Sequence, residues 1–300
     1  MNAPQISEQP DGEPPSRKGR PPEPICDTVG VTHRTWLEPL RSRLAASGLT
    51  LDDLVGLSGY SKTRLSELLR GKGYYPGWSI TYSVVKALDV PPWPLRRLWT
   101  AAAREAEKDD KWIKDGIYSV QPLGPENPPV AHRGFKEVMN HPYTAYAKTF
   151  LQTDGRAARV VAETFDILWL NWDKATSSSN TPRHAWSLLR AKVMARAETH
   201  DGHPDLRAAA MRTEAVAKSV SSDEYLDRIT RMAAFFEAVS RLSDDQLDVT
   251  VLRFLCHIHE DAVPGIVGLP PVITHSLHHH ARGALQDLHP GTETNAHPQE

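Results

Sequence analysis

The sequence predicts an all-α fold, because apolar residues recur at helical spacing and capping residues stand where these runs begin. Leu51, Leu54 and Val55 share one face of a helix, and Phe165 and Trp169 lie four positions apart on another. Hydrophobic residues make up 40% of the 300 residues, which is enough for buried cores. A chain of this length suggests about two domains.

A helix-turn-helix is predicted over residues 50–73. Thr50 is a good N-cap with Asp53 three residues later, Gly59 allows a tight turn, and Ser61 caps the second helix. The inward residues of the second helix are expected to be Leu65, Leu68 and Leu69. The outer residues near its N-terminal end, where such a helix contacts bases in the major groove, are Lys62, Thr63, Arg64, Ser66 and Glu67. The residues suited to phosphates are Arg70 and Lys72.

This stretch resembles the Xre family of regulators, the group that includes lambda repressor and Cro. The matching positions are Leu40, Arg41, Ser42, Arg43, Leu44, Gly48, Leu49, Thr50, Leu54, Gly59, Tyr60, Ser61, Leu65, Ser66, Arg70, Gly71, Pro76, Ala87, Leu88, Asp89 and Val90. The resemblance implies a five-helix lambda-repressor-like domain over residues 34–108. It also implies binding to a specific site in double-stranded DNA, with no cofactor. Because such domains commonly bind paired half-sites, a homodimer is one expected assembly.

Charge and cysteine content fit a DNA-binding protein in a reducing compartment. The formal net charge is −2, yet residues 34–108 hold twelve Lys or Arg against seven Asp or Glu. A local positive excess is what phosphate contacts need. The two cysteines, Cys26 and Cys256, are far apart and lack metal-type spacing. With no apolar signal core and no membrane-spanning run, we expect a cytoplasmic, nucleoid-associated protein without a membrane partner.

Three stretches around this domain are expected to lack a fold of their own. Residues 1–33 are rich in Pro and polar residues and are expected to be disordered. Within them, residues 17–22 resemble the core of an AT-hook, although a solvated basic tail is the simpler interpretation. Residues 109–134 contain a second Pro-rich run and are predicted to be a linker. Residues 288–300 are expected to form a polar, disordered tail.

A second helix-turn-helix is predicted over residues 241–287. Ser243 with Gln246 forms a capping signature, and residues 268–271 make the turn before the last helix. The inward face of that helix is expected to hold Ile273, Leu277, Ala281, Ala284 and Leu285. Its outer face is expected to contact DNA through Thr274, His275, His279 and Arg282. This layout resembles the C-terminal promoter-binding domain of extracytoplasmic-function sigma factors, at Leu242, Gln246, Val249, Leu252, Arg253, Phe254, Gly268, Leu269, Ser276, His279, Ala281, Arg282 and Leu285.

The middle of the chain is similar to the helical promoter-melting domain of the same sigma factors. The matching residues are Tyr146, Ala147, Lys148, Gly155, Val160, Val161, Glu163, Thr164, Phe165, Leu168, Trp169, Trp172, Ala185, Trp186, Leu188, Leu189 and Ala191. The resemblance implies a melting-domain-like part over residues 135–200, a helical spacer over 201–240 and core RNA polymerase as a partner. Acidic and polar family positions appear here as Ala158, Arg159, Val193 and Ala197. We therefore expect a divergent sigma-like half that does not replace a sigma factor.

Other function classes have less support in the sequence. There is no phosphate-binding loop, nucleophile elbow or dinucleotide fingerprint, so no enzyme is expected. The histidines near the C-terminus lack matching cysteines or a His-Glu-x-x-His motif, which favours polar surface over a metal site. Phe165, Trp169, Trp172 and Trp186 could stack on unpaired bases, but their spacing favours a buried face. Two alternatives stay open: a working sigma factor, and an interaction module with degenerate DNA-binding domains.

Overall fold

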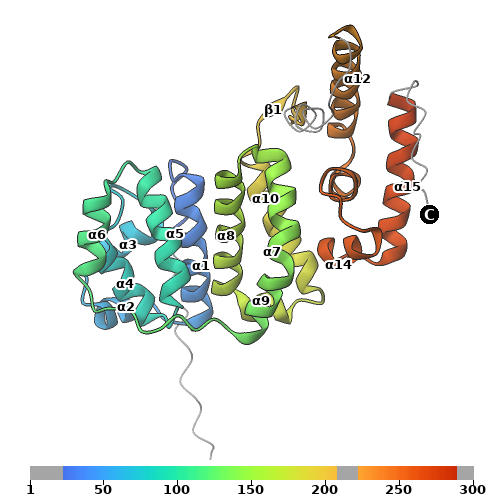
Figure 1. Cartoon of the computed structure of the whole chain (residues 1–300). Helices are drawn as coiled ribbons and strands as arrows, with labels where there is room; N and C mark the ends of the chain where they lie inside the picture. The colour runs from blue at the N-terminus through green and yellow to red at the C-terminus, as the bar shows by residue number, and fades with distance from the viewer. Residues whose placement is uncertain (1–22, 208–221, 289–300) are drawn as a thin grey trace, which may run out of the picture. The chain divides into compact units, whose positions relative to one another are not determined.

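The computed structural model describes residues 23–207 and 222–288 and divides into two compact units (Figure 1). Unit 1 holds the described residues up to Pro92 together with Leu98–Leu123, and unit 2 holds Trp93–Arg97 and the residues from Gly124 onward. The AT-hook-like segment 17–22 and the C-terminal tail from residue 289 lie outside the described residues.

Unit 1 is built from consecutive short helices. They are α1 (Val31–Ser47), α2 (Leu51–Ser58), α3 (Lys62–Arg70), α4 (Trp78–Ala87), α5 (Pro92–Glu105), which crosses the boundary between the units, and α6 (Asp110–Tyr118). A chain of hydrogen bonds crosses the core: Trp36 Nε1 donates to the Tyr75 hydroxyl over 3.1 Å, and that hydroxyl donates to the Trp99 carbonyl over 2.6 Å. Each polar atom in this series of hydrogen bonds has a partner. Trp36, Tyr75 and Trp99 are therefore buried without an unsatisfied polar group.

Two stretches expected to be irregular are ordered in unit 1. Residues 23–33 were expected to belong to a disordered tail, yet Val29 is buried and α1 begins at Val31. Residues 109–134 were expected to form a linker, yet α6 occupies their first part. Asp109 caps this helix by accepting the Trp112 N–H over 2.6 Å, and Ile113 is buried. Both expectations were wrong for these residues. Val29 and Ile113 pack against other parts of unit 1, and the composition of a short segment does not indicate such contacts.

Unit 2 is also helical. Its elements are α7 (Val130–Leu151), α8 (Asp154–Leu170), α9 (Trp172–Ser177), α10 (Thr181–Met194), β1 (Thr199–His200), β2 (His203–Pro204), α12 (Ser222–Ser240), α13 (Asp244–Thr250), the π-helix η1 (Val251–Leu255), the 3-10 helix η2 (Glu260–Ala262), α14 (Val263–Val267) and α15 (Pro271–Leu288). The strands β1 and β2 pair antiparallel, with Thr199 opposite Pro204.

The core of unit 2 confirms the packing role expected for its aromatic residues. Phe165, Trp169, Trp172 and Trp186 are all at most 8% exposed, so they pack in the interior. Tyr143 stacks on Phe165 with a ring-centroid distance of 5.7 Å. Tyr143, Phe165 and Trp186 belong to the one apolar core that α7, α8 and α10 share.

The predicted all-α class is confirmed at this level. The described residues contain only the two-residue strands β1 and β2 besides helices and loops. Among these residues, no helix has the length and apolar character needed to cross a membrane.

Candidate nucleic-acid interface

The segment from α2 to α3 has the helix-turn-helix geometry that its capping residues predict. Thr50 Oγ1 accepts the Asp53 N–H over 3.2 Å, and the Asp53 carboxylate accepts the Thr50 N–H over 2.7 Å, which completes a capping box. Gly59 ends α2 with φ of 74°, a left-handed conformation that glycine adopts without strain. Ser61 then caps α3 by accepting the Arg64 N–H. Each of these local predictions is confirmed.

The inner face of α3 is held by buried leucines. Leu65, Leu68 and Leu69 are at most 3% exposed, and Leu54 of α2 is fully buried. These residues lie three and four positions apart, so one stripe of the helix is committed to the core. The remaining positions of α3 therefore face away from the packed interior.

The C-terminal end of α3 is fixed by contacts from distant residues. The Arg41 guanidinium of α1 donates to the Leu69 carbonyl over 2.6 Å, and the Cys26 N–H donates to the Arg70 carbonyl over 2.9 Å. Gly71, which ends the helix at φ of 63°, has no room for a side chain: a Cβ there would lie 2.5 Å from Val29 Cγ2. The segment before α1 thus packs directly against the end of α3.

The structure places most of the predicted DNA-contacting residues on the free surface of α3 and of the residues that follow it. Lys62, Thr63, Arg64, Glu67 and Lys72 are exposed, whereas Ser66 and Arg70 are half-buried.

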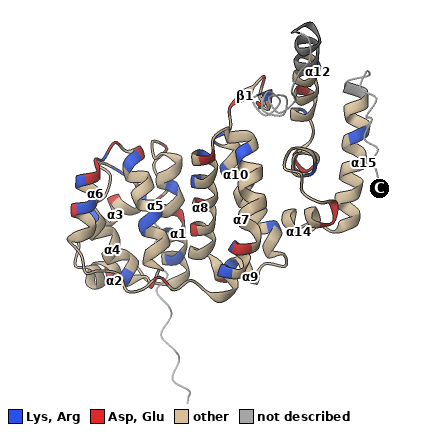
Figure 2. Ribbon diagram, in the orientation of Figure 1, with Lys and Arg blue, Asp and Glu red and all other residues tan. Residues whose placement is uncertain are grey.

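Two of these cations already have partners. Lys62 Nζ lies 2.8 Å from an Asp52 carboxylate oxygen, and Arg70 lies 2.6 Å from Glu23. No described residue forms an ion pair with Arg64. Sequence reasoning missed Glu23 and Asp52 as partners, since Glu23 lies in a segment expected to be disordered. Figure 2 shows Lys, Arg, Asp and Glu interspersed along the helices of unit 1.

The last helix, α15, exposes three of its four predicted contact residues. His275, His279 and Arg282 are exposed and lie on successive turns of one face. The prediction for Thr274 was wrong: its side chain is only 5% exposed, and its hydroxyl donates to the Pro270 carbonyl over 3.2 Å. Ile273, expected to face inward, is 47% exposed instead. The rest of the predicted inward stripe of α15 is confirmed, because Ala281 is buried and Leu277, Ala284 and Leu285 pack against the core of unit 2.

His275 is engaged with a neighbouring carboxylate. Its Nδ1 lies 2.9 Å from a Glu260 oxygen, and the second Glu260 oxygen lies 2.6 Å from the Arg253 guanidinium. The hydrogen bond with His275 and the charge of Arg253 lower the pKa of Glu260 below its ordinary value. A DNA phosphate would therefore compete with Glu260 for His275.

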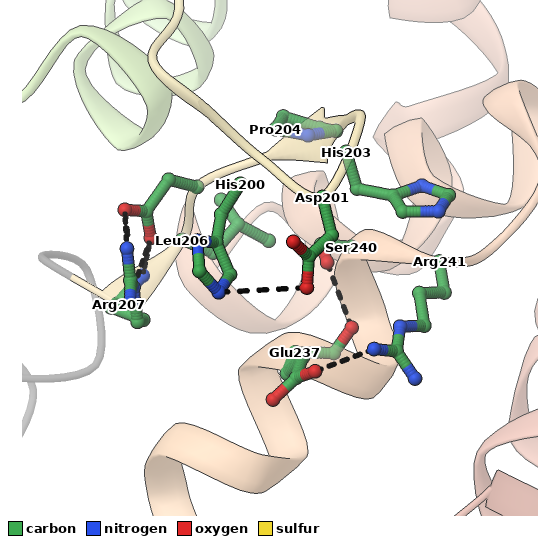
Figure 3. Close-up of a pocket in the computed structure, with 10 residues that line it drawn as sticks. His200, Asp201, His203, Pro204, Leu206, Arg207, Glu237, Ser240 and Arg241 are labelled. Atoms are coloured by element: carbon green, nitrogen blue, oxygen red, sulfur yellow. Dashed lines mark hydrogen bonds and ion pairs between the residues drawn. The ribbon is translucent and has the colours of Figure 1, made fainter.

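A small hollow beside the β1–β2 hairpin offers no comparable binding surface (Figure 3). Its volume is only about 50 Å³, well below the range of about 300–1,000 Å³ that is typical of small-molecule sites. The charged side chains around it pair with each other: Arg207 lies 2.7 Å from Asp205, and Arg241 lies 2.6 Å from Glu237. No group of His, Cys, Asp and Glu in the described parts of the chain has the arrangement of a metal site.

In the comparisons with known proteins, no family model, no curated protein and no solved structure matches this chain. Known proteins therefore do not assign a function to either unit. The basis for assigning a function is the geometry of α2, α3 and α15.

Proposed function

We propose that this protein is a sequence-specific transcriptional regulator that binds double-stranded DNA through α3. The observation that carries the proposal is the exposed N-terminal end of α3. There Lys62, Thr63 and Arg64 stand on a helix whose opposite stripe is buried and whose start follows a left-handed glycine turn. That is the arrangement with which a recognition helix contacts bases in the major groove.

The side chains of α3 have distinct chemical roles in this proposal. The planar guanidinium of Arg64 suits a bidentate contact with guanine, while Glu67 is an acceptor for the amino group of cytosine. Lys72 and Arg70, at the other end of α3, suit phosphates. The exposed pair Lys62–Asp52 costs little to exchange for a DNA contact, because such pairs contribute about 0–1 kcal/mol.

The first prediction tests the recognition helix directly. A binding site is first selected from random DNA with the full-length protein. The variant Lys62→Ala, Arg64→Ala should then lose about 1–3 kcal/mol of binding free energy for each bidentate base contact removed, and its site preference should broaden. Binding is measured by fluorescence anisotropy at several salt concentrations.

The matched control removes the same charge elsewhere in unit 1. Lys111 and Lys114 are exposed on α6, so Lys111→Ala, Lys114→Ala lowers the net charge equally without touching α3. This control should keep both affinity and site preference. Equal losses in the two variants would mean that bulk charge, and not α3, determines binding, and the proposal would fail.

We further propose that unit 2 is a divergent sigma-like half that supplies a second contact, with DNA or with core RNA polymerase. The support is the exposed face of α15 with His275, His279 and Arg282. The protein-interaction alternative is favoured by a different observation: Val272 is 79% exposed and Ile273 is 47% exposed at the start of the same helix.

A further inference from the structure

The segment that precedes α1, residues 23–30, is an ordered part of unit 1 that lies against the C-terminal end of α3. Val29 is buried and packs against Gly71, the residue that ends α3. The Arg34 guanidinium of α1 donates to the Cys26 carbonyl over 2.8 Å and to the Val29 carbonyl over 3.2 Å. The segment is therefore anchored to α1 and to the end of α3 at the same time.

This segment contacts both the backbone and the side chain of Arg70. The Cys26 N–H donates to the Arg70 carbonyl over 2.9 Å, and a Glu23 carboxylate oxygen lies 2.6 Å from Arg70 Nη1. The Nε atom of the same guanidinium is buried and forms no hydrogen bond with any described residue. An incoming anion can therefore reach only the terminal nitrogens of Arg70, and Glu23 occupies one of them.

A DNA phosphate and Glu23 would compete for the same guanidinium. The Arg70 side chain is 30% exposed and the Glu23 side chain is 55% exposed, so a phosphate in solution can reach this ion pair. Arginine at this end of a recognition helix suits a phosphate, but a carboxylate beside it repels one. Because the anchored segment belongs to the same molecule, Glu23 competes at a high effective concentration.

We propose that residues 23–30 form an autoinhibitory contact, in which Glu23 keeps Arg70 from a DNA phosphate and so lowers the affinity of α3 for DNA. This inference rests on the proposed function, because it concerns the regulation of the same helix. On binding, Arg70 exchanges a carboxylate for a phosphate oxygen. The contacts of Val29 and Cys26 stay in place, so the exchange leaves the packing of α3 unchanged.

The experiment is a double-mutant cycle in the full-length protein. Fluorescence anisotropy measures binding to a duplex with the selected site and to a duplex of unrelated sequence. Glu23→Gln should tighten binding to both by about two- to fivefold, the range expected for an exposed ion pair. The slope of log affinity against log salt should steepen by about one, because Arg70 gains a phosphate contact. In the Arg70→Gln background, Glu23→Gln should change neither quantity.

The matched control is Asp115→Asn, which removes one negative charge from an exposed position of α6. It should leave binding to both duplexes unchanged, and circular dichroism confirms that every variant folds. Unchanged affinity of Glu23→Gln, or an equal gain in the Arg70→Gln background, would overturn the autoinhibitory contact. Equal binding of the two duplexes by wild type would contradict the proposed function instead, while the unrelated duplex would still decide the role of Glu23. Absence of binding to either duplex in every variant would contradict both.

Discussion

His33, a half-buried side chain of α1, should make the stability of unit 1 depend on pH. The ring stacks on Trp36 at a centroid distance of 4.9 Å and packs against Tyr75 at 5.0 Å. Burial, followed by the neighbouring Arg34 charge, lowers the pKa of His33 to about 4 from an ordinary value of 6.5. Between these values the unfolded chain binds a proton that the folded chain does not, so folding is less favourable at lower pH.

The prediction at this scale concerns His33→Phe, which keeps an aromatic ring but cannot titrate. Wild-type stability should fall as the pH decreases from 6.5 to about 4, and the variant should lose less over the same range. Urea denaturation of both proteins at a series of pH values gives their unfolding free energies. The difference between the two proteins at each pH removes the contribution of the carboxylates that both contain. Parallel pH profiles would show that His33 does not contribute.

At the scale of elements, a buried carboxylate connects three helices of unit 2. Asp248 of α13 is 1% exposed and accepts from the Tyr146 hydroxyl of α7 over 2.6 Å and from Trp186 Nε1 of α10 over 2.8 Å. Arg190 of α10 lies 3.0 Å away. Burial raises the pKa of Asp248, while the charge of Arg190 and the three hydrogen bonds oppose that rise. The network joins α13 to α7 and α10 through side-chain hydrogen bonds.

Asp248→Ala should therefore destabilise unit 2 strongly. Removing the Asp248 carboxylate leaves the Tyr146 hydroxyl and Trp186 Nε1 buried without their acceptor, while Arg190 keeps its ion pair with Asp244. The expected loss of unfolding free energy is about 1–3 kcal/mol for each of the two unsatisfied groups.

The control is Asp245→Ala on the same helix, whose carboxylate pairs with Arg183 and is 40% exposed. That variant should lose no more than about 1 kcal/mol. Similar losses for the two variants in urea denaturation would contradict the role of Asp248.

At the scale of the whole molecule, the proposed DNA-recognition helix α3 belongs to unit 1, and the exposed face of α15 belongs to unit 2. The Lys62→Ala, Arg64→Ala variant should lack specific DNA binding by α3, so the DNA binding that remains measures the contribution of unit 2. His275→Gln, His279→Gln in the same chain should weaken its residual DNA binding further, because both side chains lie on the exposed face of α15. In a transcription assay with core RNA polymerase, the full-length wild-type protein should produce no promoter-specific transcript, whereas a genuine sigma factor would produce one. Efficient open-complex formation would contradict this prediction and identify the protein as a working sigma factor.

The sequence by itself determined the local features of this protein. The capping box of Thr50 and Asp53, the left-handed turn at Gly59, the Ser61 cap and the buried leucines of α3 could all be predicted. Each depends on residues within about four positions, where helical spacing and side-chain chemistry act directly. The exposed positions of α3 follow from the same spacing, so most of the candidate site was predictable.

Only the tertiary structure decided which residues are partners and which face of each helix is buried. The pairing of Glu23 with Arg70, the order of α6 in a stretch expected to be a linker, and the burial of Thr274 all depend on distant packing partners. The same holds for a hollow beside α15, whose lining combines residues of α13, η1, η2, α14 and α15. Burial depends on which surfaces meet in space, and a short window of sequence does not contain that information.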